Sequence, residues 1–182
     1  MRIIGGKLKG RTIQPPMGYG ARPTTDYARE GLFNILSNEY EFEDLKVLDL
    51  FGGTGAVAFE FASRGVGRVY SVEMNRDNAA FIKREAARLG LDNVTAVHDN
   101  VFDFLPVCHE KFDIVFADPP YALEGLDTIP DKVLGAGILH PERYFILEHG
   151  GEYNFSGHPL LVKERCYGRV HFSFFETPSE SL

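Results

Sequence analysis

The sequence predicts an α/β fold built on a doubly wound, mainly parallel sheet, and two observations support this prediction. From Leu45 onwards, short apolar stretches typical of strands alternate with longer amphipathic stretches typical of helices. The stretch at 112–117 is nearly all apolar, as expected of a central strand that is covered on both faces. The carboxyl ends of such parallel strands meet at one edge of the sheet, where ligands bind.

Two short segments with β-propensity precede this alternation. The segments at 2–4 and 11–13 are separated by glycines and followed by a double proline, a pattern that predicts a small hairpin. Thr24 or Thr25 is expected to cap the next helix, because apolar residues recur at helical spacing from 28 to 36.

The remaining elements follow in order along the chain. Strands are predicted at 46–51, 68–73, 94–97, 112–117, 144–148, 161–166 and 168–176, with a turn around Tyr167-Gly168 joining the last two. Helices are predicted at 56–64, 75–89 and 102–108, and within 123–134, where Pro130 restricts the helix. We expect two parts, a basic hairpin and helix at 1–40 appended to a single compact unit at 41–182.

Length and composition exclude several classes of protein. The chain has 182 residues, of which 44% are hydrophobic and 25% charged, as in a globular domain rather than a disordered or fibrous one. No stretch resembles a membrane helix or a secretory signal. The two cysteines form no CxxC pair and no histidine lies at metal-ligand spacing, so we expect no metal site and no disulfide. These features predict a cytoplasmic protein, for which a monomer suffices.

Charge is distributed unevenly along the chain. Residues 1–22 carry +5 and the rest −12, against a net charge of −7. The basic side chains of this segment are Arg2, Lys7, Lys9, Arg11 and Arg22. A basic segment on an acidic body predicts docking onto a polyanion such as RNA, although a solvated hairpin would have the same composition.

A glycine-rich turn follows the first strand of the alternating region. Residues 49–55 read Asp-Leu-Phe-Gly-Gly-Thr-Gly, and glycines let the backbone approach a ligand while the next helix offers free N–H groups. Glu73 ends the second strand, where a carboxylate can accept both hydroxyl protons of a ribose. We therefore predict a cofactor that contains adenosine. Its predicted contacts here are Asp49, Phe51, Gly52, Gly53, Gly55 and Glu73.

The identity of that cofactor stays open at this point. Gly53-x-Gly55-x-x-Ala58 fits the relaxed dinucleotide fingerprint, so a nicotinamide-dependent oxidoreductase is an alternative. Asp49 argues against it, because a carboxylate there would repel a pyrophosphate but suit an amino group and a sulfonium. Asn100, after the third strand, can contact adenine through its amide or simply cap the next helix.

Asp118-Pro119-Pro120-Tyr121 follows the fourth predicted strand. The prolines stiffen the loop, which presents a carboxylate, free carbonyls and an aromatic ring. This platform fits a planar base with an exocyclic amine, which stacks on Tyr121 while Asp118 and the Pro119 carbonyl accept its N–H groups. The alternative is a proline-rich turn with a surface tyrosine.

The chemistry of an exocyclic amine explains why such acceptors are needed. Its lone pair is delocalised into the ring, so it reacts only when its N–H groups are held and its developing charge is stabilised. A carboxylate can accept from both N1–H and the 2-amino group of guanine, whereas adenine and cytosine present an amine beside an acceptor. Asp118 therefore favours guanine, although the Pro119 carbonyl can serve any amine.

The chain resembles the RsmD-type bacterial methyltransferases, which modify the N2 amine of guanine in small-subunit ribosomal RNA. The resemblance spans nearly the whole chain. It rests on the opening residues 1–7, the segment Arg22-Pro23-Thr24-Thr25-Asp26, the turn at 49–55 and the loop at 118–121. Other methyltransferases share the turn and the loop, so the segment at 22–34 makes the combination specific.

This resemblance implies a Rossmann-like class I S-adenosylmethionine-dependent methyltransferase fold, whose seven-stranded, mostly parallel sheet ends in an antiparallel hairpin. It implies S-adenosylmethionine as cofactor, with Asp118 at its site, and a methyltransferase domain at 41–182. It also implies that Asp118, Pro119 and Tyr121 hold the target guanine of 16S rRNA or of a small ribosomal subunit particle. Arg22, Arg29 and Glu30 are expected to meet the cofactor or RNA phosphate, or to form a salt-bridged helix face.

Three alternatives stand beside an rRNA methyltransferase. A DNA methyltransferase acting on the N6 amine of adenine would use the same loop, but the chain leaves little room for a target-recognition domain. The others are the nicotinamide-dependent oxidoreductase and a catalytically silent RNA-binding module. The intact Asp118 and Glu73 argue against the silent module.

Overall fold

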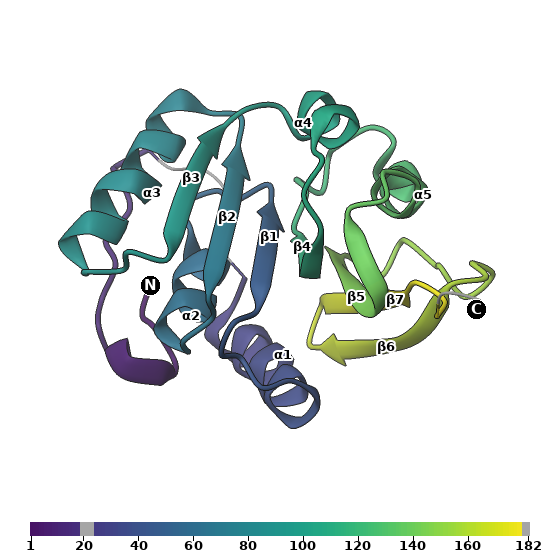
Figure 1. Cartoon of the computed structure of the whole chain (residues 1–182), viewed down its shortest axis with the longest axis horizontal. Helices are drawn as coiled ribbons and strands as arrows, with labels where there is room; N and C mark the ends of the chain where they lie inside the picture. Colours follow the sequence, from purple (N-terminus) through teal and green to yellow (C-terminus); the bar gives the residue numbers. More distant parts are fainter. Residues whose placement is uncertain (19–23, 180–182) are drawn as a thin grey trace.

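The computed structural model describes residues 1–18 and 24–179. Within these ranges, seven strands form one sheet in the order β3-β2-β1-β4-β5-β7-β6 (Figure 1). The pairs from β3 to β5 are parallel, whereas β7 runs antiparallel to both β5 and β6. The predicted doubly wound sheet with a C-terminal antiparallel hairpin is therefore confirmed.

The elements agree closely with the predicted ones. The strands are β1 (Lys46–Leu50), β2 (Arg68–Glu73), β3 (Val94–His98), β4 (Phe112–Ala117), β5 (Leu139–His149), β6 (Leu161–Tyr167) and β7 (Val170–Glu176). The helices are α1 (Asp26–Glu39), α2 (Ala56–Ser63), α3 (Arg76–Arg88), α4 (Val101–Val107) and α5 (Ile129–Gly135). Short 3₁₀ turns lie at Gly6–Leu8 and Leu126–Thr128. Among the described residues, no helix is long and apolar enough to cross a membrane.

Two elements differ from the prediction for clear reasons. Pro130 lies in the first turn of α5, where its missing N–H has no helical partner to lose, so it does not restrict the helix. β5 begins at Leu139 rather than at 144, because its register against β4 shifts between Phe112 and Ile114. Glu142 lies at this irregularity with a φ of 61°. The irregularity interrupts the apolar pattern that marks the rest of the strand.

The sheet carries an apolar core on each face. One core contains the buried residues of α1, α2 and α3, and the other contains those of α4 and α5. Successive residues of each strand join opposite cores, as with Val47 and Leu48 in β1 and Ile114 and Val115 in β4. Both faces are covered, and because β1 to β5 are parallel, their carboxyl ends all lie at the same edge of the sheet.

The N-terminal segment forms the predicted hairpin. Arg2 and Thr12 form an antiparallel bridge, and the Ile3 N–H donates to the Arg11 carbonyl at 2.9 Å. Ile3 and Ile13 are buried in the core that contains α1, α2 and α3. The hairpin and α1 thus share a core with α2 and α3.

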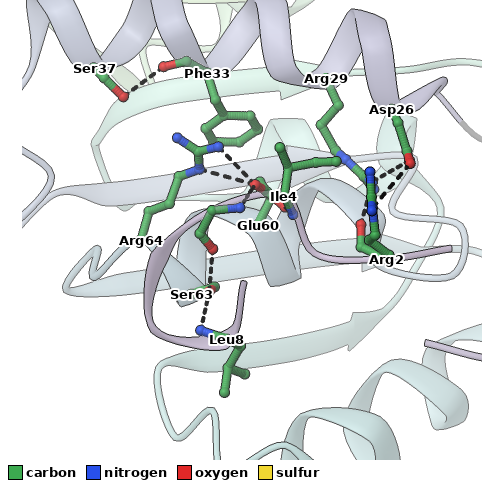
Figure 2. A network of polar contacts seen from close by, with 11 residues as sticks. Arg2, Ile4, Leu8, Asp26, Arg29, Phe33, Ser37, Glu60, Ser63 and Arg64 are labelled. Atoms are coloured by element: carbon green, nitrogen blue, oxygen red, sulfur yellow. Dashed lines mark hydrogen bonds and ion pairs between the residues drawn. The ribbon is translucent and has the colours of Figure 1, made fainter. Parts of the chain in front are cut away.

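A buried carboxylate, Glu60 of α2, fixes this hairpin (Figure 2). Glu60 is fully buried, and its two oxygens accept the N–H groups of Ile4 and Gly5, each at 2.9 Å. The Arg64 guanidinium donates to Glu60 at 2.9 and 3.1 Å. Ser63 Oγ accepts the Leu8 N–H at 2.9 Å. α2 therefore supplies partners for backbone groups that the short hairpin leaves unpaired.

Candidate active site

A cavity of about 450 Å³ opens at the carboxyl ends of β1, β2 and β4. Most of the predicted site residues line it, namely Asp49, Phe51, Gly52, Gly53, Glu73, Asn100, Asp118, Pro119 and Tyr121. The cavity lies where the strand order reverses between β1 and β4, the usual ligand site of such sheets. The structure thus brings together residues that span about 70 positions of the chain.

The glycine-rich turn is held in shape by Glu73. One carboxylate oxygen of Glu73 accepts the Gly53 N–H at 2.6 Å, and the other accepts the Asn75 N–H at 3.0 Å. Each oxygen retains lone pairs for the hydroxyl groups of a ribose. Gly55 has a φ of 88° and precedes α2, but it does not line the cavity. Gly55 therefore shapes the turn rather than the cavity wall.

Asn100 caps the next helix and also lines the cavity, so the contact with adenine stays a prediction. Its Oδ1 accepts the Phe102 N–H at 2.9 Å and so caps α4. Its side chain also lies in the cavity lining, where Nδ2 donates to the Met74 sulfur at 3.4 Å. The second lone pair of Oδ1 remains available for the amino group of an adenine.

Asp49 and Asp118 line this cavity, and a third carboxylate, Glu148, lies behind it and is linked to Asp118 through Thr24. Asp49 and Glu148, at the ends of β1 and β5, are each 2% exposed, and Asp118 follows β4. Thr24 Oγ1 donates to Glu148 Oε2 at 2.6 Å and lies 3.4 Å from Asp118 Oδ2. Ser71 Oγ donates to Asp49 Oδ2 at 3.0 Å. We call Asp49, Asp118 and Glu148 the carboxylate cluster.

Burial raises the pKa of every member of the carboxylate cluster. The pKa of Asp49 rises to about 7, as does that of Glu148. The pKa of Asp118 rises well above its ordinary value, first because of burial and then because of the negative charges of Glu148 and Asp49. A cofactor that carries positive charge lowers these pKa values, so the cluster suits a cation.

We expect the stability of the cofactor-free protein to fall as the pH rises from 5 to 8. The carboxyls of Asp49 and Glu148 ionise more easily in the unfolded chain, so their contribution is present below pH 4 and lost as the pH approaches 7. Glu148→Gln should reduce the fall by about 2 kcal/mol, at ~1.4 kcal/mol per pKa unit, because part of the unfolded-state titration lies below pH 5. Urea unfolding at both pH values tests this. Glu124→Gln, at an exposed position, is the control, and an equal fall in both variants contradicts the expectation.

The basic residues of the hairpin lie apart from the cavity. Lys7, Lys9 and Arg11 are exposed, and Arg2 lies 3.7 Å from Asp26. Their turn contacts the C-terminal end of α2, about 12 Å along the helix from the end beside the cavity. Arg22 lies outside the described residues. The hairpin thus faces the opposite edge of the sheet from the cavity (Figure 1).

Of the remaining charged residues of the segment at 22–34, Arg29 has a structural position. Its side chain is 1% exposed and donates to the Arg2 carbonyl at 2.6 Å and to Asp26 Oδ1 at 2.8 Å (Figure 2). Glu30 is exposed on α1. Arg29 therefore belongs to the salt-bridged helix face rather than to the cavity.

A second group of polar side chains lies on the β6–β7 hairpin. Glu164, Cys166 and His171 bring one ligand atom each to within 4.8 Å of one another. His171 Nδ1 also lies 3.0 Å from Cys166 Sγ, as expected of a hydrogen-bonded cross-strand pair. None of the three lines the cofactor cavity. The expectation of no metal site thus stays a prediction.

Sheet order, cavity and carboxylate cluster define the class of protein: a class I S-adenosylmethionine-dependent methyltransferase. The chain belongs to the family described as Conserved hypothetical protein 95, whose model matches residues 1–176. This is the RsmD-type family that the sequence resembles. The cofactor is S-adenosylmethionine, and the residues fit it: Glu73 and Asn100 offer the acceptors that would hold its ribose and adenine, and the buried Asp49 carboxylate suits its positive charge.

Relatives span the whole chain. Ribosomal RNA small subunit methyltransferase D of Escherichia coli K12 is 31% identical over 99% of this chain and 91% of its own length. The namesake of Haemophilus influenzae is 32% identical over 97% and 93%. A solved structure of a Thermus hypothetical protein has a TM-score of 0.86 and 30% identity over 97% of this chain and 99% of that one. At 17% identity and a TM-score of 0.67, SMU.776 complexed with SAH shares the fold over 82% of this chain and 49% of that one.

Proposed function

We propose that this protein transfers a methyl group from S-adenosylmethionine to the exocyclic N2 amine of a guanine in small-subunit (16S) rRNA. The observation that carries the proposal is the loop Asp118-Pro119-Pro120-Tyr121, which borders the cofactor cavity at the end of β4. The relatives named Ribosomal RNA small subunit methyltransferase D support an rRNA substrate. A carboxylate at 118 supports guanine, because it matches two adjacent N–H groups.

The bound cofactor supplies an electrophilic methyl group on a sulfonium. The lone pair of guanine N2 forms the new N–C bond as the carbon–sulfur bond breaks, and that electron pair stays on sulfur. One proton then leaves the nitrogen, and Asp118, in its ionised form, is the acceptor. Burial, and after it the negative charges of Glu148 and Asp49, raises the pKa of Asp118 and so its affinity for this proton.

The loop positions the amine for this step. Asp118 and the Pro119 carbonyl accept the N–H groups of guanine, which aims the nitrogen at the methyl carbon. Tyr121, which is 45% exposed, offers a ring on which the base stacks. The base has to leave its own stack or be unpaired before it reaches these groups.

The basic residues of the hairpin are proposed to bind rRNA phosphates at a distance from the reacting base. Such a separation suits a large substrate, either folded rRNA or an assembled small subunit in the cytoplasm. We expect Lys7→Ala/Lys9→Ala/Arg11→Ala to reduce the slope of log affinity against log salt by about 2, at ~0.7 per phosphate contact. Filter binding of rRNA at several salt concentrations measures this. Lys83→Ala/Arg84→Ala on the exposed face of α3 is the control, and equal slopes would remove the hairpin from the interface.

The test of the function is transfer from isotope-labelled S-adenosylmethionine. Unmodified small subunits, free 16S rRNA and DNA are offered in parallel, and the labelled nucleoside is identified by mass spectrometry. Label in N2-methylguanosine supports the proposal, and the better of the two RNA substrates identifies the natural one. Label in a DNA base supports an adenine-N6 enzyme instead. Cofactor binding without label indicates a silent RNA-binding module, and binding of a nicotinamide dinucleotide an oxidoreductase.

A further inference from the structure

A second cavity of about 370 Å³ lies between the start of α1 and the turn that joins β6 to β7. It is lined by Thr25, Tyr27, Tyr121, Glu148, Tyr167, Gly168, Arg169 and Val170. We call it the tyrosine cavity. Tyr121 is already assigned to the target base, but neither the family resemblance nor the reaction accounts for Tyr27 and Tyr167.

The tyrosine cavity adjoins the reaction centre. Tyr121 lines both this cavity and the cofactor cavity. Glu148, a member of the carboxylate cluster, also lines the tyrosine cavity and is linked to Asp118 through Thr24. A base that stacks on Tyr121 would therefore lie next to the tyrosine cavity.

The rings of the tyrosine cavity form a supported platform. Tyr27 and Tyr167 meet edge to face, with centroids 5.5 Å apart and planes at 82°. Tyr167 also lies against Gly31 of α1, where an added Cβ would be 2.1 Å from the ring. Glycine at 31 thus lets the ring pack on the helix backbone. Tyr27 remains 65% exposed, so the platform still offers aromatic surface to a ligand.

Charge favours a nucleotide as the occupant. Arg169 is exposed and is the one basic side chain among the described residues that line the tyrosine cavity. The one acidic lining residue, Glu148, is 2% exposed and already accepts from Thr24. Aromatic rings beside an arginine are the surface on which unpaired bases and their phosphates bind.

We propose that the tyrosine cavity holds the unpaired nucleotide next to the target guanine. This inference rests on the proposed function. Tyr27 and Tyr167 stack on the neighbouring base, and Arg169 binds its phosphate. Tyr121 separates this base from the guanine. The enzyme would thus select a guanine whose neighbour in the strand is also unstacked.

The test is steady-state methylation of unmodified small subunits and of free 16S rRNA. We expect Tyr167→Ala and Arg169→Ala each to raise the KM for RNA about tenfold, with kcat within twofold and the affinity for S-adenosylmethionine unchanged. Tyr167→Phe keeps the ring and should restore the wild-type KM. Arg165→Ala removes an exposed arginine of the same hairpin that does not line the cavity and is the matched control.

The possible failures are distinguishable. If the wild-type enzyme binds the cofactor but labels no guanine in rRNA, the proposed function fails. If the wild type is active and Tyr167→Ala and Arg169→Ala match Arg165→Ala, the inference is overturned and the function stands. A loss in kcat alone would also overturn it. So would a rise in KM on assembled subunits but not on free rRNA, because a ribosomal protein would then be the occupant.

Discussion

Replacing Asp118 with alanine is expected to lower methyl transfer about a thousandfold or more while S-adenosylmethionine still binds. In the proposed mechanism Asp118 aims the amine and takes its proton, and oriented acceptors of this kind are worth ~10²–10³ in rate, with further losses from misalignment. Cofactor binding should survive, because Glu73, Asn100 and the glycine-rich turn are untouched. Transfer of label and calorimetric binding of the cofactor measure the two effects separately.

Asp118→Asn is the informative companion to this variant. The amide keeps one acceptor oxygen in the same place but cannot take a proton, so we expect a smaller loss, of about tenfold to a hundredfold. Asp127→Ala removes an exposed carboxylate from the 3₁₀ turn before α5 and serves as the control. Near-normal turnover of Asp118→Ala would contradict the assigned role of the loop.

Replacing Glu60 with alanine is expected to cost about 3–5 kcal/mol of unfolding free energy. Glu60 is fully buried, so its loss leaves the Arg64 guanidinium and the N–H groups of Ile4 and Gly5 without their acceptor (Figure 2). Urea denaturation measures the loss. Limited trypsin digestion at Lys7 and Lys9 reports whether the hairpin has detached from α2.

The pair Glu85–Arg88 on α3 provides a matched control for Glu60. It is also an ion pair within one helix, but the Arg88 side chain is 51% exposed. Glu85 is itself only 10% exposed, but Arg88 stays in contact with water, so we expect Glu85→Ala to cost about 1 kcal/mol, well below the cost of Glu60→Ala. If Glu60→Ala costs no more than Glu85→Ala, Glu60 does not hold the hairpin.

Much of the fold could be predicted because strand and helix periodicities alternate strongly from Leu45 onwards. Because the carboxyl ends of parallel strands lie at one edge of the sheet, the sequence also predicts which polar residues lie near one another. These residues are Asp49, Glu73, Asn100 and Asp118. The early start of β5 could not be predicted, because it pairs with β4 across a register shift that leaves no periodic signal. Local propensity says nothing of such pairing.

The parts of the site that the sequence analysis missed depend on tertiary contacts. The sequence marks Glu148 only as the last residue of the strand predicted at 144–148, because its partner Thr24 lies 124 positions away. The three rings of the tyrosine cavity come from α1, the loop after β4 and the end of β6, so no motif joins them. Gly55 is a different case. The motif predicts its place in the turn correctly, but it also predicts a cofactor contact, and Gly55 does not line the cavity.

The position of Thr24 implies that the segment before residue 41 is part of the active site. A chain that begins at residue 41 would keep all seven strands and the loop at 118–121, yet lose the hydroxyl between Asp118 and Glu148 and two walls of the tyrosine cavity. During synthesis the site stays incomplete until β5 has paired with β4, long after Thr24 has been made. A complete site therefore requires contact between two parts of the chain that lie 124 positions apart.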